Sequence, residues 1–418
     1  MTTEYEILVS KLSEALVDIP EPTLRGFGEL SPFTSESTFY YQINKDRLGK
    51  VITCLESIQS AIRLFDNKMF NTGDGVSLVT MELLARWLVR QAQLVGSKVA
   101  VRKLELYLQK STTSCQNVLA ISGIKVHSEL NITDSIKLIP FQDLPESHAK
   151  EAIYPPFMKP EFALKLGFVP QSSQGYRPPE AAVIINAEIS PQIYSEGQLP
   201  KPQDFLPMYE FCEFLTLVKS TTPVPVAAWC ELSEDTPCAQ LFGGGWSGPV
   251  VDVLSKTVST ITQQDWDAHK ELYLKFLALP QAVRDLLRVP IERLNQARRR
   301  GNMADRAIDL GVACEALFLN DKSHKEQISF TLRLRAALFL ADEYEERQQL
   351  LNFFSSLYSC RSQAAHTGKL DAIMRVTGRG KINSRQLLEE GDDYCVQAIK
   401  RIISLGKFPD WNELMLKK

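Results

Sequence analysis

The sequence contains no run of roughly 18 apolar residues, the length that a membrane-spanning helix requires. Its first residues, MTTEYEILVSKLSEAL, do not combine a basic segment with an apolar run, so we expect no secretory signal peptide. Its eight cysteines include no Cys-x-x-Cys pair, and their spacing does not indicate a disulfide framework. These absences predict a cytoplasmic protein with reduced thiols and no membrane partner.

Motifs of several large enzyme classes are missing as well. The glycine-rich segment 243–249 (GGGWSGP) is not followed by the Gly-Lys-Ser/Thr of a phosphate-binding P-loop. There is no Gly-x-Ser-x-Gly nucleophile turn and no His-Glu-x-x-His zinc motif. The five histidines are scattered and not clustered with other metal ligands. We therefore expect neither a metal nor an organic cofactor.

Hydrophobic patterning predicts an α+β N-terminal region followed by an all-α helical bundle. Residues 1–35 are acidic and punctuated by prolines, which is typical of an extended lead-in, and residues 36–112 have helical periodicity. Residues 113–265 hold short Val- and Ile-rich segments separated by Pro, Ser, Gln and Asn, a pattern typical of strands. From residue 271 onward the strand signals vanish and apolar residues recur at helical spacing. We predict a regulatory α+β region over 1–270, with helical (36–112) and β-rich (113–265) parts, and a helical domain over 271–418.

Single elements can be bounded within these regions. Gly96 is a candidate interruption of one long helical pattern, and the prolines of 153–180 indicate an irregular connection. The predicted strands cover 117–126, 135–141, 181–189 and 224–232, and the main predicted helices cover 47–65, 76–108, 203–220, 303–319, 329–340, 343–366 and 384–405.

Charge is distributed unevenly along the chain. Residues 271–418 contain 24 Lys and Arg against 19 Asp and Glu, a net charge of +5, whereas residues 1–270 have a net charge of −8. A polyanion is therefore expected to bind the C-terminal region.

The segment 357–368 (LYSCRSQAAHTG) contains the two residues to which we assign chemistry, Arg361 and His366. Five helical steps rotate by about 500°, which leaves these side chains about 140° apart on a continuous helix. They can converge if the helix tightens or ends between them. Alternatively, two copies of the chain can pool their arginines and histidines around one cleft.

An arginine with a histidine suits cleavage of an RNA phosphodiester without a metal. A histidine can take the proton of the 2′-hydroxyl or protonate the leaving 5′-oxygen. The planar guanidinium of arginine donates hydrogen bonds to the phosphate oxygens as negative charge builds up on them.

The surrounding sequence resembles the Apea-like branch of HEPN domains over roughly residues 280–415. Residues 291–319 (IERLNQARRRGNMADRAIDLGVACEALFL) match its second-helix region, with a basic run before a D-R-x-x-D-L core and a glutamate, Glu315, in C-E-A-L. Residues 329–340 (SFTLRLRAALFL) resemble its next helix, with Arg335 before an Ala-Ala pair. LYSCRSQAAHTG then falls where the family carries its Arg-x(4–6)-His motif.

This resemblance implies a dimeric, metal-independent endoribonuclease used as a toxin in anti-phage defence by abortive infection. Arg361 and His366 would be its catalytic pair. Many active HEPN proteins carry Asn, Asp or His directly after the arginine, whereas this chain has Ser362, which can support the site by hydrogen bonding but with less reach. The resemblance also places Glu315 and Arg335 on neighbouring helices, where we expect them to pair in the bundle interior and to hold the helix that bears Arg361.

Two basic segments are candidates for RNA binding. Arg298, Arg299 and Arg300 stand at a predicted helix end, where they act either as a solvated cap or as phosphate ligands. Arg375, Arg379 and Lys381 lie in RVTGRGKINSR, which has no acidic residue and forms either a flexible RNA clamp or a disordered surface loop.

The leading hypothesis is therefore a two-part defence protein. The HEPN region would cut RNA as a homodimer, and the N-terminal region would sense a phage-derived or nucleotide trigger. The alternative is a non-catalytic HEPN scaffold or nucleotide-binding interaction module, which Ser362 favours.

Overall fold

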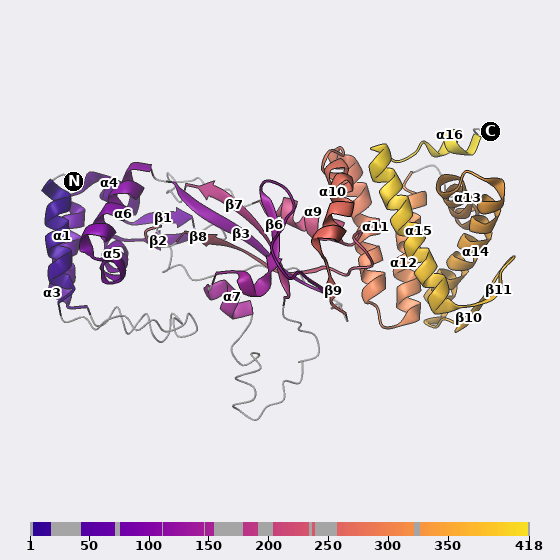
Figure 1. The fold of residues 1–418 in the computed structure, drawn as a ribbon, viewed down its shortest axis with the longest axis horizontal. Helices are drawn as coiled ribbons and strands as arrows, with labels where there is room; N and C mark the ends of the chain where they lie inside the picture. The colour runs from indigo at the N-terminus through magenta and orange to yellow at the C-terminus, as the bar shows by residue number, and fades with distance from the viewer. Residues whose placement is uncertain are drawn as a thin grey trace, which may run out of the picture.

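The chain forms three parts in a row along the long axis of the molecule (Figure 1). Helices lie at the N-terminal end, an antiparallel sheet lies in the middle, and further helices lie at the C-terminal end. The helices and sheet of the first two parts make the N-terminal region α+β, as predicted. No helix in the described ranges combines the length and the apolar composition needed to cross a lipid bilayer. The computed structural model describes residues 3–17, 43–71, 76–110, 112–145, 147–153, 179–190, 204–233, 236–238, 257–321 and 327–416.

The N-terminal part has a hydrophobic core of its own. Its first helix, α1, is a departure from the expected lead-in over 1–35, because Leu8 and Leu12 lie one helical turn apart and are both fully buried. The rest of that predicted lead-in, from residue 18, lies outside the described residues. The elements of this part are α1 (Thr3–Ala15), α3 (Lys45–Glu56), α4 (Gln59–Phe65), β1 (Lys68–Asn71), β2 (Val76–Val79), α5 (Met81–Val95) and α6 (Ser97–Lys110).

Both long helical patterns of this part are divided in the structure. The first breaks at Ile58, which is buried in an extended conformation between α3 and α4. The second begins as strand β2 and breaks at Gly96, confirming the expected interruption. Gly96 has φ +84°, a positive value that favours glycine, and it caps the C-terminal end of α5.

A five-stranded antiparallel sheet forms the middle part, with strand order β5-β6-β7-β3-β8. The predicted strands 181–189 and 224–232 coincide with β7 and β8, and the other two overlap β6 and β3. Most of the predicted irregular connection, from residue 154 to 178, lies outside the described residues. The strands are β3 (Thr113–Ser122), β5 (Leu130–Asn131), β6 (Ile136–Pro140), β7 (Ala181–Ile189) and β8 (Val224–Leu232), and β4 (Ile124–Lys125) pairs in parallel with β9 (Ser259–Thr260).

Both faces of the sheet are covered. Val118 and Ala120 of β3 face a small core that includes η2 (Phe141–Asp143) and α7 (His148–Ile153). Leu119 and Ile121, which alternate with them, face the core on the other side. Helix α9 (Leu206–Leu215), shorter than the predicted 203–220, packs on strands of this second face.

That second core continues from the sheet into the C-terminal helices. Phe211 and Phe214 of α9 lie with their ring centroids 5.4 Å and 4.9 Å from that of Tyr273 in α10. Helix α10 begins at Gln263, before the predicted domain start at 271. The sheet and the C-terminal helices share one hydrophobic core.

The C-terminal helices are arranged around α15, which contacts each of α10 to α14. The predicted helices 303–319, 329–340, 343–366 and 384–405 agree with α12 to α15 to within a residue or so at each end. The helices are α10 (Gln263–Leu277), α11 (Gln281–Arg299), α12 (Met303–Phe318), α13 (Ile328–Leu340), α14 (Tyr344–Thr367), α15 (Ser384–Leu405) and α16 (Trp411–Leu416).

The C-terminal region is not entirely helical, contrary to the prediction. Between α14 and α15, the basic segment forms an antiparallel hairpin of β10 (Ile373–Val376) and β11 (Gly380–Asn383). Val376 and Ile382 are buried against the helices and anchor it. Gly378 and Gly380 both have positive φ and allow the tight turn. The segment is thus an ordered hairpin and not a loop.

Candidate functional site

Arg361 and His366 lie on one uninterrupted helix. Helix α14 runs to Thr367 and ends at Gly368, whose φ of +66° is the left-handed conformation of a helix C-cap. Of the two ways in which the side chains could converge, an end of the helix between them is therefore not realised, because the helix ends just after His366. Ideal helical geometry separates their positions by about 140° around the axis and about 7.5 Å along it.

The side chain of Arg361 is seated against helix α12. A Cβ atom built on Gly311 would lie only 2.3 Å from Cγ of Arg361 and 2.8 Å from its Cβ, so the two helices approach closely at this point. The guanidinium Nη2 lies 3.3 Å from Oε1 of Glu315, one turn further along α12. Its Cζ lies 5.8 Å from the ring centroid of Tyr358. Arg361 is thus held by packing, by a carboxylate and by an aromatic ring while its side chain stays 30% exposed.

Gly311 is a site residue that the sequence analysis did not single out. Its only signal was a glycine in the interior of a helix, where glycine costs about 0.5–1 kcal/mol relative to alanine. Such a cost is tolerated where the backbone must let another group approach closely.

The predicted pair of Glu315 with Arg335 is not formed, since Glu315 binds Arg361 instead. The side chain of Arg335 is fully buried. Its guanidinium donates to both carboxylate oxygens of Asp321, at 2.7 Å and 2.9 Å, and to the carbonyl of Phe318 at 2.9 Å. Its Cζ also lies 5.1 Å from the ring centroid of Trp411. Arg335 therefore joins α13 to the end of α12 and to α16, a structural role away from Arg361.

His366 is exposed near the C-terminal end of α14. Within the described part of the chain, its imidazole has no hydrogen-bond or ion-pair partner. Ser362 is partly exposed, and helical geometry places it about 100° from Arg361 and about 40° from His366 around the axis. A surface stripe through Ser362 and Ala365 therefore separates the two candidate catalytic residues.

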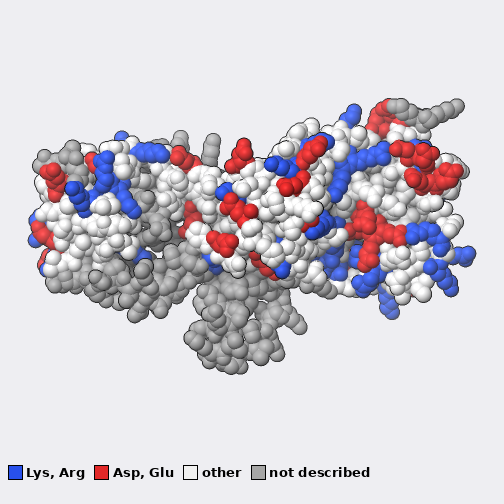
Figure 2. All heavy atoms as spheres, in the orientation of Figure 1, with Lys and Arg blue, Asp and Glu red and all other residues white. Residues whose placement is uncertain are grey.

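The β10–β11 hairpin follows directly after His366 and carries exposed cations. Arg375 and Lys381 are opposite each other in the register and both are exposed. Arg379 differs, because it donates two hydrogen bonds to the carboxylate of Glu390 on α15, at 2.5 Å and 2.9 Å. Lys and Arg side chains gather at the end of the molecule where this hairpin lies (Figure 2).

The arginine run at the end of α11 does not present three cations to a ligand. The side chain of Arg298 is only 6% exposed. Its guanidinium binds both carboxylate oxygens of Asp392 and the carbonyls of Thr216 and Thr221, which follow α9. Its assignment to RNA binding is wrong, because this arginine holds α11, α15 and the segment after α9 together.

The other two arginines of the run are also engaged within the protein. Arg299 is half-buried, and this burial lowers the pKa of its guanidinium. Nε of Arg300 donates to Asp309 of α12 at 2.7 Å. The side chain of Asp309 is 5% exposed and also accepts a hydrogen bond from Arg293 at 3.1 Å. These ion pairs stabilise the α11–α12 corner, whereas Arg375 and Lys381 of the hairpin are exposed.

Comparison of the chain with protein-family models, curated proteins and solved structures finds no match. A function can therefore be proposed only from the geometry around α14 and from the residues of 280–415 that predict a HEPN domain.

Proposed function

We propose that the C-terminal region is a metal-independent endoribonuclease of the HEPN type that acts as a homodimer in anti-phage defence by abortive infection. The observation that supports it best is the arrangement on α14. An arginine held in place by Glu315 and an exposed histidine flank a stripe of small residues on one helix. A second α14 packed on that stripe would bring the arginine of one copy toward the histidine of the other.

The reaction would divide the work between the two residue types. One imidazole removes the proton of the 2′-hydroxyl, the 2′-oxygen attacks phosphorus, and the bond from phosphorus to the 5′-oxygen breaks. The leaving 5′-oxygen takes a proton from water, which yields a cyclic 2′,3′-phosphate and a 5′-hydroxyl, and the imidazolium returns its proton to the solvent. Arg361 donates to the non-bridging oxygens, whose negative charge is greatest in the transition state. Glu315 keeps the guanidinium of Arg361 oriented while no RNA is bound. Arg375 and Lys381 attract the RNA backbone.

The α+β region would restrain or trigger this nuclease. It is coupled to the helices by a shared core and by Arg298, which ties the segment after α9 to Asp392 of α15. A ligand-induced shift of α9 would therefore displace α15, which packs against α14. A phage-derived or nucleotide trigger would act on the N-terminal region.

Complementation between two inactive variants tests the shared site. Arg361→Ala and His366→Ala are each expected to lower the cleavage rate of single-stranded RNA by about 10²–10⁴. When the two are unfolded, mixed equally and refolded together, about half of the dimers are mixed, and each of those has one intact site of two. The mixture should therefore recover about a quarter of the wild-type rate.

The controls separate the alternatives. His127→Ala removes an exposed histidine far from α14 in the sequence and should leave the rate unchanged. A mixture as inactive as either variant alone would show that each copy acts by itself. Wild-type protein that binds RNA or dimerises without cutting RNA, with or without phage infection of the host, would support the non-catalytic HEPN scaffold to which Ser362 points.

A further inference from the structure

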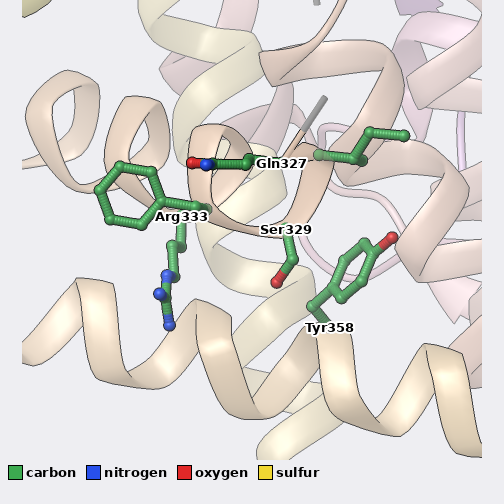
Figure 3. A pocket seen from close by; sticks show the side chains of 6 residues that line it. Gln327, Ser329, Arg333 and Tyr358 are labelled. Atoms are coloured by element: carbon green, nitrogen blue, oxygen red, sulfur yellow. The ribbon is translucent and has the colours of Figure 1, made fainter. Parts of the chain in front are cut away.

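A hollow of about 630 Å³ lies between α13 and α14, next to Arg361. Tyr358 links the two places, because its ring lines the hollow and its centroid lies 5.8 Å from Cζ of Arg361. Ser329 of α13 and Tyr358 of α14 extend into the space between the two helices from opposite sides (Figure 3). The hollow is lined by Gln327, Ile328, Ser329, Phe330, Arg333 and Tyr358.

Among the described residues, the walls of the hollow combine apolar groups with one cation and include no carboxylate. Phe330 is 44% exposed and Ile328 is 42% exposed, and both of these large apolar side chains belong to the first turn of α13. Cζ of Arg333 lies 5.2 Å from the centroid of the Phe330 ring. A guanidinium and aromatic rings around one space form a surface on which a planar ligand can stack.

Hydrogen-bonding groups in the lining are left for a ligand. Nη1 of Arg333 donates to Oγ of Ser355 at 3.0 Å, which fixes the guanidinium between α13 and α14. Among the described residues, the side chains of Gln327 and Ser329 and the hydroxyl of Tyr358 have no hydrogen-bond partner. An amide and two hydroxyls can each donate and accept, as the edge of a nucleobase requires.

We propose that this hollow binds one nucleobase of the RNA strand, beside the phosphate that Arg361 contacts. The base stacks on Phe330 and Tyr358, and its edge meets Gln327 and Ser329. This inference rests on the proposed ribonuclease function for its position in the reaction, and it predicts that cleavage depends on the base at one position. The same chemistry would suit a free mononucleotide, and the experiment distinguishes the two sources.

Binding is measured on the full chain carrying His366→Ala, so that RNA is not cut. The probes are fluorescein-labelled single-stranded oligoribonucleotides of A, C, G or U, and the readout is the Kd from fluorescence anisotropy. Phe330→Ser should weaken binding of the preferred oligonucleotide by about 5- to 150-fold, the range found when a stacking aromatic is removed. Phe330→Tyr keeps the ring and should stay within about 3-fold of the parent, given the usual scatter of single contacts.

Tyr344→Ala is the matched control. Tyr344 is 73% exposed and lies on the same helix as Tyr358, but at its N-terminal end, so its removal should leave the Kd unchanged. Circular dichroism of each variant verifies that the helices are retained. AMP, CMP, GMP and UMP are titrated as competitors against the parent and against Phe330→Ser.

Each outcome decides between the sources. The proposal is supported if Phe330→Ser weakens oligonucleotide binding while Phe330→Tyr and Tyr344→Ala do not. If Phe330→Ser impairs mononucleotide binding but leaves oligonucleotide binding intact, the hollow takes a free nucleotide and the RNA-base assignment is overturned. If Phe330→Ser binds oligonucleotides and mononucleotides as tightly as the parent does, the hollow is not a base site. RNA cleavage by the wild-type protein would then still support the ribonuclease function. Conversely, if Phe330→Ser weakens RNA binding but the wild-type protein does not cut RNA, the ribonuclease function is refuted and the base-binding site is retained.

Discussion

Replacing Gly311 by alanine tests whether the close approach of α12 to Arg361 positions this arginine. Alanine in a helix interior normally stabilises the folded protein by about 0.5–1 kcal/mol relative to glycine. Here its Cβ would meet Cγ and Cβ of Arg361 at 2.3 Å and 2.8 Å, which are atoms near the backbone of α14 and cannot move aside alone. Overpacking of this kind costs about 1–3 kcal/mol. We therefore expect Gly311→Ala to change the free energy of unfolding by between about zero and 2.5 kcal/mol in the destabilising direction.

Gly49→Ala provides the matched control. Gly49 lies inside α3, and a Cβ built there meets nothing within 4 Å. This substitution should stabilise the protein by about 0.5–1 kcal/mol, because only the helix propensity changes. The difference between the two variants isolates the steric contact with Arg361, at about 1–3 kcal/mol.

The assay is urea unfolding followed by far-ultraviolet circular dichroism, with RNA cleavage measured on the same samples. In Gly311→Ala the displaced Arg361 loses its contact with Glu315, so cleavage should fall at urea concentrations where the variant is still fully folded. If Gly311→Ala is stabilised as much as Gly49→Ala and cuts RNA at the wild-type rate, the contact does not position Arg361 and the reasoning is refuted.

Three further predictions concern the ion pairs, the titration and the caps that support the site. Asp392→Ala leaves the buried guanidinium of Arg298 without its carboxylate and should cost about 3–5 kcal/mol, measured by urea unfolding, whereas the double variant with Arg298→Met should recover part of this loss. Burial raises the pKa of Glu213 to about 7, although the positive charge of Arg288 lowers it. The folded state therefore binds the carboxyl proton of Glu213 more tightly than the unfolded state, in which the pKa is near 4.5. Stability contributed by this group is therefore present below about pH 4.5 and is lost as pH rises to about 7. Glu213→Gln should raise the melting temperature at about pH 8 and not at about pH 4, and an equal effect at both values would show that the carboxyl does not titrate in this range. Thr262→Ala removes a capping box at the start of α10 and should cost roughly 0.5–2 kcal/mol, with amide hydrogen exchange accelerated first in that turn.

Local patterns predicted individual elements well where one face of the element is buried. The strands 181–189 and 224–232 coincide with β7, an interior strand, and β8, an edge strand, because apolar residues of both strands are buried against the cores that cover the sheet. The helix 384–405 coincides with α15, whose apolar residues recur at helical spacing because it lies at the centre of the bundle.

The elements that were missed depend on contacts distant in the sequence. The hairpin β10–β11 is rich in cations and glycine, and only the burial of Val376 and Ile382 against the helices makes it ordered. Helix α1 lies in a segment that prolines mark as extended, and it is stabilised by burying Leu8 and Leu12 against its neighbours α3, α5 and α6.

The sequence by itself determined the candidate pair and its angular separation. The spacing of Arg361 and His366 dictates that they diverge on a helix, because every residue adds the same rotation. It also determined the basic character of the segment after His366, since charge depends on composition alone.

Only the tertiary structure decided which charges meet. Pairing of ionic groups depends on which helix faces pack together, and the spacing along one helix carries no information about its neighbours. Glu315 therefore binds Arg361 and not Arg335, and Arg298 is buried against Asp392 and not exposed to RNA. The close approach that seats Arg361 on Gly311 has the same origin, because it joins residues of two helices that the chain brings together only on folding.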